Sequence, residues 1–150
     1  MLNENTKSYL LDMGWYPNRY VDSQDEQIIL IENGFIINEK AIDFICEFNK
    51  LIGCFPRNTN KTMEAISFDI KYVVKNFFPD LANGIYSQTI NEGLCLVGSA
   101  YNGHLALYVS YSGKLYGGFD DFFELLGENY YEGLNTLFLD KRGQLVELIG

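Results

Sequence analysis

The chain has 150 residues, a length typical of one domain, and we expect residues 1–150 to form a single domain. Hydrophobic residues make up 47% of it and aromatic residues 15%, which excludes a disordered chain. Asp and Glu number 20 against 11 Lys and Arg, for a net charge of −9. Nucleic-acid binders use basic patches to neutralise phosphates, so this composition argues against a nucleic-acid partner. The acidic surface either attracts a basic protein or only keeps the chain soluble.

The cysteines and the start of the chain indicate a cytoplasmic protein. Cys46, Cys54 and Cys95 are odd in number and form no Cys-x-x-Cys pair, which favours buried free thiols over disulfides or zinc ligands. The first 14 residues lack the basic and apolar regions of a signal peptide. Residues 93–113 carry no charge, but a turn-forming pair in their middle favours two strands over a membrane span.

The first part of the chain predicts helices. A short helix over residues 6–13 is ended by Gly14, which can take the left-handed conformation of a helix C-cap. Asp22 is expected to cap a second helix, and Gly34 to end it. Between Gly14 and Asp22, the lone Trp15 and Arg19 suggest a packed corner, in which the arginine bonds carbonyls at a helix end or pairs with an acid.

A third helix follows, capped by Asn38 and ended by Gly53. Its apolar residues recur at helical spacing and define one face: Ala41, Phe44, Ile45, Phe48, Leu51 and Ile52. The alternating Ile66, Phe68 and Ile70 then predict a half-buried strand. Residues 70–78 return to helical spacing until Pro79 stops the pattern, and residues 80–91 fit either a loop or a weak helix.

The second part predicts an antiparallel meander. A strand over residues 94–101 leads into Asn102-Gly103, a strong signal for a two-residue hairpin because a type I′ turn needs positive φ at both positions. Ser112-Gly113 makes the next turn, between a strand from residue 104 and one over residues 114–119. Asn129 is expected to cap a helix over residues 130–139, before a short strand at residues 144–149. An antiparallel sheet with helices packed around it is an α+β fold.

Acidic residues concentrate between residues 115 and 140, where no Lys or Arg interrupts them. Most such runs are solvated faces, yet this one is the sharpest electrostatic feature of the chain. We therefore take six residues as a candidate partner-binding surface, namely Asp120, Asp121, Glu124, Glu128, Tyr130 and Tyr131.

The sequence carries no recognisable catalytic motif, and it predicts a protein that is not an enzyme and binds no metal or cofactor. The only histidine, His104, follows a predicted turn and is expected to face solvent. Carboxylates are the only reactive side chains that occur in large number. A small carboxylate-dependent hydrolase is therefore the alternative hypothesis in which the protein is an enzyme. Asp120 and Asp121 are adjacent and would point to opposite faces of a strand, which disfavours a paired site.

The order of turn and core residues resembles the third group of the SUKH-type immunity proteins over nearly the whole chain. The residues that carry the resemblance are Gly14-Trp15, Arg19, Asp22, Gly34-Phe35, Ala41, Phe44, Ile45, Phe48, Val97-Gly98, Asn102-Gly103-His104, Ser112-Gly113-Lys114-Leu115-Tyr116 and Leu126-Gly127. The chain departs from the family pattern at Asn49-Lys50-Leu51, where such proteins carry Gly-Gly-Leu.

The resemblance implies an α+β fold and a cytoplasmic protein that binds and neutralises a cognate toxin of a bacterial polymorphic toxin system. Such toxins are often nucleases, whose basic active sites an acidic protein can cover. The superfamily also contains regulators of cell-wall synthesis and viral proteins, so an intracellular scaffold or regulator is the alternative. The sequence leaves the oligomeric state open.

Overall fold

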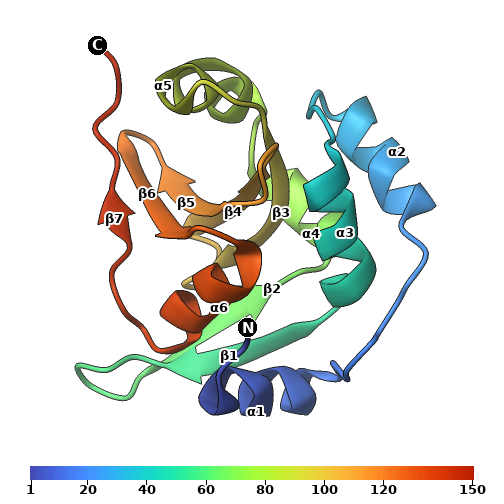
Figure 1. The fold of residues 1–150 in the computed structure, drawn as a ribbon, viewed down its shortest axis with the longest axis vertical. Coiled ribbons are helices and arrows are strands. Elements are labelled where there is room, and N and C mark those ends of the chain that lie inside the picture. Colours follow the sequence, from blue (N-terminus) through green and yellow to red (C-terminus); the bar gives the residue numbers. More distant parts are fainter.

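A computed structural model describes residues 1–150 and places one antiparallel sheet at the centre of the protein (Figure 1). Every strand pairs with the next strand along the chain, so the order is β1 to β7. The strands are β1 (Ile52–Pro56), β2 (Met63–Ser67), β3 (Leu94–Ala100), β4 (Leu105–Ser110), β5 (Leu115–Phe119), β6 (Phe122–Gly127) and β7 (Gln144–Leu145). The predicted α+β fold and its C-terminal-half meander are confirmed.

The helices precede the sheet or connect its strands. They are α1 (Glu4–Met13), α2 (Gln24–Glu32), α3 (Glu39–Phe48), α4 (Ile70–Val73), the 3₁₀ turn η1 (Val74–Asn76), the π-helical segment η2 (Ala82–Tyr86), α5 (Ser87–Ile90) and α6 (Tyr130–Phe138). The side chains of Asn3, Asn38 and Asn129 accept hydrogen bonds from backbone amides in the first turns of α1, α3 and α6. The caps predicted at Asn38 and Asn129 are therefore confirmed.

Both faces of the central strands are covered by helices. Helices α3 and α6 pack on one face, and η2 packs on the other. Strand side chains alternate between faces, so Leu107 and Val109 of β4 point one way while Tyr108 points toward Tyr86 of η2. As a result, every residue of β3 and β4 is buried.

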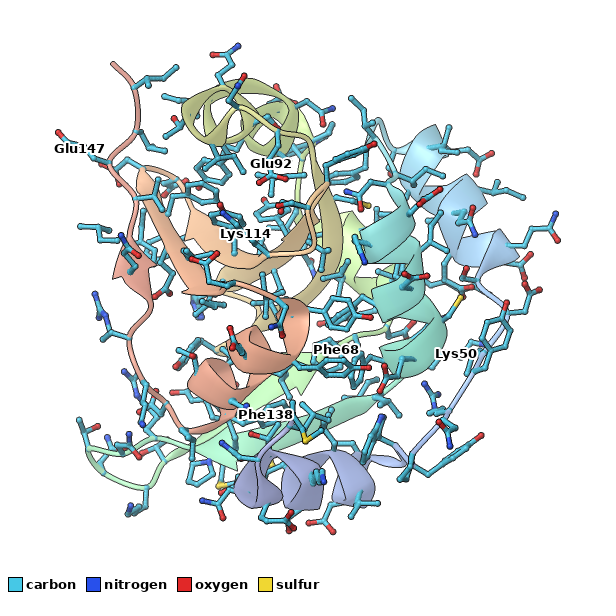
Figure 2. All side chains as sticks on the ribbon, viewed as in Figure 1. Lys50, Phe68, Glu92, Lys114, Phe138 and Glu147 are labelled. Carbon is cyan, nitrogen blue, oxygen red and sulfur yellow. The ribbon has the colours of Figure 1, made fainter.

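Aromatic side chains fill both layers of the core. On the α3 side the ring of Phe44 contacts Phe48, Phe68 and Tyr130, with centroid distances of 4.8 to 5.4 Å. On the other side the ring of Phe123 stacks between Tyr86 and Tyr116. Figure 2 shows the Phe68 and Phe138 side chains inside the molecule, whereas the Glu147 side chain points outward.

The residues that carry the family resemblance form turns and core contacts. Positive φ angles occur at Gly14, Gly34, Gly103 and Gly113. A Cβ atom at Gly98, beside the β-bulge in β3, would lie 2.8 Å from the ring of Phe68, so this position requires glycine. Phe48 and Tyr116 are buried.

Trp15 and Arg19 form the packed corner that the sequence suggests. The indole N–H of Trp15 donates to a carboxylate oxygen of Glu47 at 2.9 Å. The Arg19 guanidinium donates to the backbone oxygens of Glu47 at 2.6 Å and Asn49 at 2.9 Å. These carbonyls lie at the end of α3, where no further turn of helix supplies N–H donors. Arg19 thus ties the segment after α1 to the end of α3.

The predicted end of the third helix is wrong. Helix α3 stops at Phe48, because Asn49 leaves the helical region with a ψ of 144° and Lys50 has positive φ. The following residues pair with the segment after β2 instead, since the backbone N–H of Phe68 donates to the oxygen of Leu51. Gly53 consequently lies in β1 and does not end a helix.

Three other local predictions differ from the structure. Ser23, one residue after the predicted Asp22, holds the N-cap position of α2. Ile70 begins α4 and does not extend a strand. Cys54, expected to be buried, is exposed on β1, whereas Cys46 and Cys95 are buried and all three thiols are free.

The region after Phe119 also differs from the prediction. Residues 122–127 form β6, a strand that the sequence did not predict. Asp120 and Asp121 connect β5 to β6, because Phe119 pairs with Phe122. They lie in a turn, with Asp120 at positive φ, and not in a strand.

Candidate binding surface at the turn end of the sheet

Four connecting segments meet at one end of the sheet, which we call the turn end. They are the β1–β2 hairpin loop, the β3–β4 turn (Tyr101 to His104), the β5–β6 turn and the segment after α6. Between them lies an open groove of about 560 Å³. It is lined by residues of the β1–β2 loop, the β3–β4 turn and the segment after α6, and by Phe119 and Phe122 on either side of the β5–β6 turn. Its walls carry both charges, with Arg57, Lys141 and Arg142 beside Glu64, Glu124 and Asp140.

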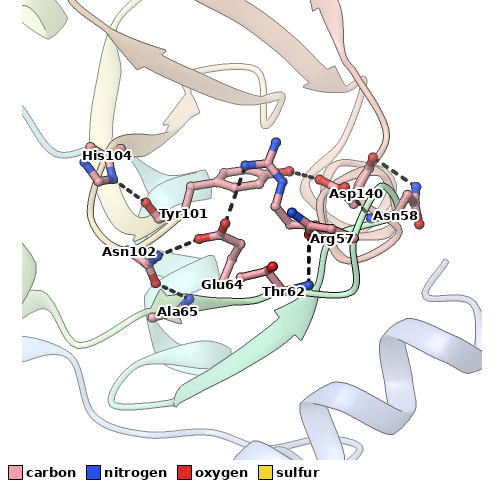
Figure 3. Close-up of polar contacts among 10 residues, drawn as sticks. Arg57, Asn58, Thr62, Glu64, Ala65, Tyr101, Asn102, His104 and Asp140 are labelled. Atoms are coloured by element: carbon pink, nitrogen blue, oxygen red, sulfur yellow. Dashed lines mark hydrogen bonds and ion pairs between the residues drawn. The ribbon is translucent and has the colours of Figure 1, made fainter.

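Glu64 joins the first two segments (Figure 3). Its buried carboxylate accepts a hydrogen bond from the Asn102 side-chain amide at 2.6 Å and lies 3.5 Å from the Arg57 guanidinium. The Asn102 side-chain oxygen accepts from the backbone N–H of Ala65 at 2.7 Å. The β3–β4 turn is thereby fixed against β2, in a conformation with positive φ at Tyr101, Asn102 and Gly103.

Asp140 joins the segment after α6 to the same turn (Figure 3). One carboxylate oxygen accepts from the Tyr101 hydroxyl at 2.6 Å, and the other accepts from the backbone N–H of Asn58 at 2.7 Å. Burial and the hydrogen bond to Asp140 raise the pKa of Tyr101, so its hydroxyl stays protonated as the donor. The Arg57 guanidinium lies over the Tyr101 ring, 5.6 Å from its centroid.

Glu124 holds the chain that leads into β7. Its carboxylate is buried on β6 and accepts a hydrogen bond from the backbone N–H of Gly143 at 2.8 Å. Burial raises the pKa of Glu124, and the Gly143 hydrogen bond and the nearby Arg142 oppose that shift. The Arg142 guanidinium in turn lies 5.6 Å from the centroid of the Phe122 ring. Glu124 therefore fixes the segment after α6 against β6 at the wall of the groove.

Replacing Glu124 with Gln is expected to raise the free energy of unfolding at pH 7. A raised folded-state pKa means that the charged form destabilises the folded protein as the pH rises through that value. Glutamine removes the charge and keeps an oxygen that accepts from Gly143. The gain should shrink toward zero below about pH 4, where the wild-type carboxyl is itself protonated.

Urea unfolding of both proteins at pH 4 and pH 7 measures this difference. The control is Glu128→Gln, whose exposed carboxylate lies 3.5 Å from Lys114 and should change stability by less than about 0.5 kcal/mol at either pH. A loss of stability at pH 7 in Glu124→Gln would show that the charge of Glu124 supports the fold.

The three acids of the groove are all bonded to neighbouring segments, so they act as ties that fix its shape. His104 is exposed as predicted, and its Nδ1 lies 2.8 Å from the backbone oxygen of Tyr101. No group of three or more His, Cys, Asp and Glu side chains is arranged to hold a metal ion. A rigid, mixed-charge groove of this kind is suited to binding a partner surface.

A second hollow of about 590 Å³ adjoins the groove at Phe119, which lines both. We call it the aromatic–acidic hollow, after the side chains of Phe77, Phe78, Asp80, Phe119 and Asp120 that line it. Phe78 is 84% exposed, the largest exposure of any aromatic side chain in the protein. Large exposed aromatic side chains at the edge of a hollow are typical of binding surfaces.

The structure separates the six residues that the sequence groups as a candidate interface. Asp120 and Asp121 are exposed in the β5–β6 turn, at the turn end. Glu124 lines the groove but is buried. The other three, Glu128, Tyr130 and Tyr131, follow β6 at its opposite end.

Their contacts show that the two tyrosines hold the fold. Tyr130 packs edge-on against Phe44, with ring centroids 5.3 Å apart. The Tyr131 hydroxyl donates to the Glu47 carboxylate at 2.5 Å, the same carboxylate that accepts from Trp15. Tyr131 therefore extends the corner that Trp15 begins.

Sequence reasoning missed most of the residues that shape the turn end. Arg57, Glu64 and Tyr101 carried no signal because their partners are distant in the chain. Phe78 was assigned to a helical pattern, but the helix ends at Asn76 and leaves its side chain in solvent. The one available sign was that Phe78 directly precedes Pro79, which breaks the helical pattern.

The fold defines an α+β protein whose connecting segments form an open groove at one end of an antiparallel sheet. The chain matches the SUKH-3 immunity protein family over residues 2–140 and belongs to that family. No curated protein and no solved structure matches the chain. None of its helices has both the length and the apolar character needed to span a bilayer.

Proposed function

We propose that residues 1–150 act as one binding domain in the bacterial cytoplasm, which neutralises a cognate polymorphic toxin by covering its active site with the turn end. Membership of the SUKH-3 immunity protein family is the observation that carries this proposal. The toxin is a basic protein, and a nuclease is the class that fits best, because a site that binds phosphates is positively charged.

Two features of the turn end and of the adjoining aromatic–acidic hollow support this surface as the interface. Exposed aromatic rings at Phe78 and Phe119 supply the apolar contact that anchors protein interfaces. Asp80, Asp120 and Asp121 are exposed beside them, and negative charge steers a basic partner toward the surface. Of the six residues first considered, the proposal retains Asp120 and Asp121 as contacts.

The test is co-expression with the toxin domain encoded by the adjacent reading frame. We expect growth to be restored and the two proteins to purify as a complex. The Asp80→Lys/Asp121→Lys variant should bind the toxin at least about 10-fold more weakly, mainly through slower association. Asp120 is left in place because Asp tolerates its positive φ better than Lys does.

The matched control reverses two exposed acids elsewhere, Asp25→Lys/Glu32→Lys on α2. This variant has the same net charge as Asp80→Lys/Asp121→Lys, but it should bind the toxin as tightly as the wild type does. Equal losses in both variants would point to overall charge and not to the turn end. Full toxin activity without any complex, or a phenotype that appears without a toxin, would instead favour the scaffold or regulator.

A further inference from the structure

The aromatic–acidic hollow differs from the neighbouring groove in the state of its acids. Asp80 and Asp120 accept no side-chain hydrogen bond, and neither belongs to any of the ion pairs, which are Lys7–Glu4, Arg57–Glu64 and Lys114–Glu128. The groove acids, by contrast, are each bonded to a neighbouring segment. The carboxylates of the hollow are therefore free to bind a partner.

The floor of the hollow carries a polar group without a partner. Tyr108 on β4 lines the hollow, is only 2% exposed, and its hydroxyl makes no hydrogen bond within the protein. The neighbouring Tyr86 hydroxyl is engaged, since it donates to the backbone oxygen of Asp120 at 2.7 Å. The only fully buried polar side-chain atoms without a partner belong to Thr6 and Asn49, so the Tyr108 hydroxyl keeps contact with the hollow and can bond a polar ligand atom there.

The β5–β6 turn that forms one wall is held in place. The bond from Tyr86 fixes the backbone at Asp120, and the Phe119 ring stacks on Phe122 with centroids 5.1 Å apart. The exposed Phe78, which follows the end of η1 and precedes Pro79, also lines the hollow. The hollow thus combines a preformed acidic wall, an exposed ring and a polar floor.

We propose that this hollow receives an arginine side chain of the toxin, with the guanidinium against the Phe78 ring and bonded to Asp80, Asp120 and the Tyr108 hydroxyl. The inference rests on the proposed function and names the chemistry of its central contact. Arginine fits best because its planar group stacks on an aromatic face and donates several hydrogen bonds at once. A lysine ammonium offers three donors and no plane.

Four substitutions separate the parts of this site in a binding assay with the adjacent toxin domain. Asp80→Asn/Asp120→Asn keeps shape and turn conformation but removes the charge, and should weaken binding about 10- to 100-fold with a smaller dependence on salt. Tyr108→Phe removes only the hydroxyl, and should weaken binding about 3- to 10-fold. Phe78→Leu keeps an apolar side chain without a ring face, and should weaken binding about 2- to 5-fold.

The control is Asp25→Asn/Ile28→Leu on α2, which neutralises one exposed acid and alters one exposed apolar side chain away from the hollow, and should leave affinity unchanged. All variants should unfold at the wild-type temperature within a few degrees, apart from a small shift in Tyr108→Phe. Affinity that falls in Phe78→Leu but not in the Asn variant would mean an apolar occupant and overturn the proposal. Wild-type affinity in all hollow variants would overturn it too.

A second measurement does not need the toxin. In an NMR titration, N-acetyl-arginine amide should shift the signals of Phe78, Phe119 and Asp120, whereas its neutral citrulline counterpart should not. The shifts should vanish in Asp80→Asn/Asp120→Asn. Arginine shifts without any toxin binding would leave the site standing and reject the proposed function. Toxin binding without arginine shifts, and without losses of affinity in the variants, would support the proposed function and reject the arginine site.

Discussion

Replacing Phe44 with Ala is expected to lower the free energy of unfolding by about 3–5 kcal/mol, the range for removing a buried aromatic ring. Phe44 is fully buried on α3, and its ring contacts the rings of Phe48, Phe68 and Tyr130. These partners come from α3, from the segment after β2 and from α6. The cavity would therefore open where three separate segments meet, and none of them can close it alone.

Phe78→Ala is the matched control, because it makes the same chemical change at an 84% exposed ring. Its effect on stability should stay below about 0.5 kcal/mol. Urea unfolding with an unchanged m-value measures both variants. The ranking should reverse in the toxin-binding assay at a temperature where both remain folded, since Phe78 lies in the aromatic–acidic hollow and Phe44 in the core. Equal stability losses would contradict the burial that the structure assigns to the two rings.

The parts of the fold that the sequence predicts well are those that local chemistry determines. The caps at Asn38 and Asn129 need only a side chain that reaches an amide three residues ahead. The β3–β4 turn contains Asn102-Gly103 with positive φ at both residues, as predicted, although Ala100 pairs with Leu105 and the loop is four residues long. Asn102 also bonds to Ala65 of β2, a contact between distant segments that the local turn signal does not contain.

The parts that were missed depend on distant segments. The apolar spacing of α3 continues past Phe48, yet pairing between Leu51 and Phe68 draws the chain into an extended path. Strand β6 carries Glu124 inward, which obscures its pattern until the Gly143 amide that satisfies the carboxylate is known. Tertiary contacts override local propensity in both cases.

The turn end is harder to predict for the same reason. Glu64 and Asn102 are 38 residues apart, and Tyr101 and Asp140 are 39 apart. The sequence identified an acidic surface near Asp120 and Asp121, but it did not distinguish the free acids from those that tie segments together. That distinction needs the hydrogen-bond partner of each carboxylate, and only the fold supplies it.

Among the glycines, a Cβ atom would come closest to neighbouring backbone at Gly127, where β6 leads into α6, and Gly127→Ala tests this contact. A Cβ atom at Gly127 would lie 2.2 Å from the backbone nitrogen of Gly133 and 2.7 Å from its Cα. Both atoms belong to the first turns of α6, so the clash cannot be relieved by rotating a side chain. We expect the free energy of unfolding to fall by about 3 kcal/mol, at the upper end for overpacked sites.

Gly93→Ala is the control, because a Cβ atom there meets nothing within 4 Å and its φ is not positive. It should change stability by less than about 0.5 kcal/mol. Gly127→Ala should also weaken toxin binding, since α6 leads directly to Asp140, which fixes Tyr101 at the turn end. If the two alanine variants were equally stable, α6 would not pack so closely on β6, and the helix could not position the groove in this way.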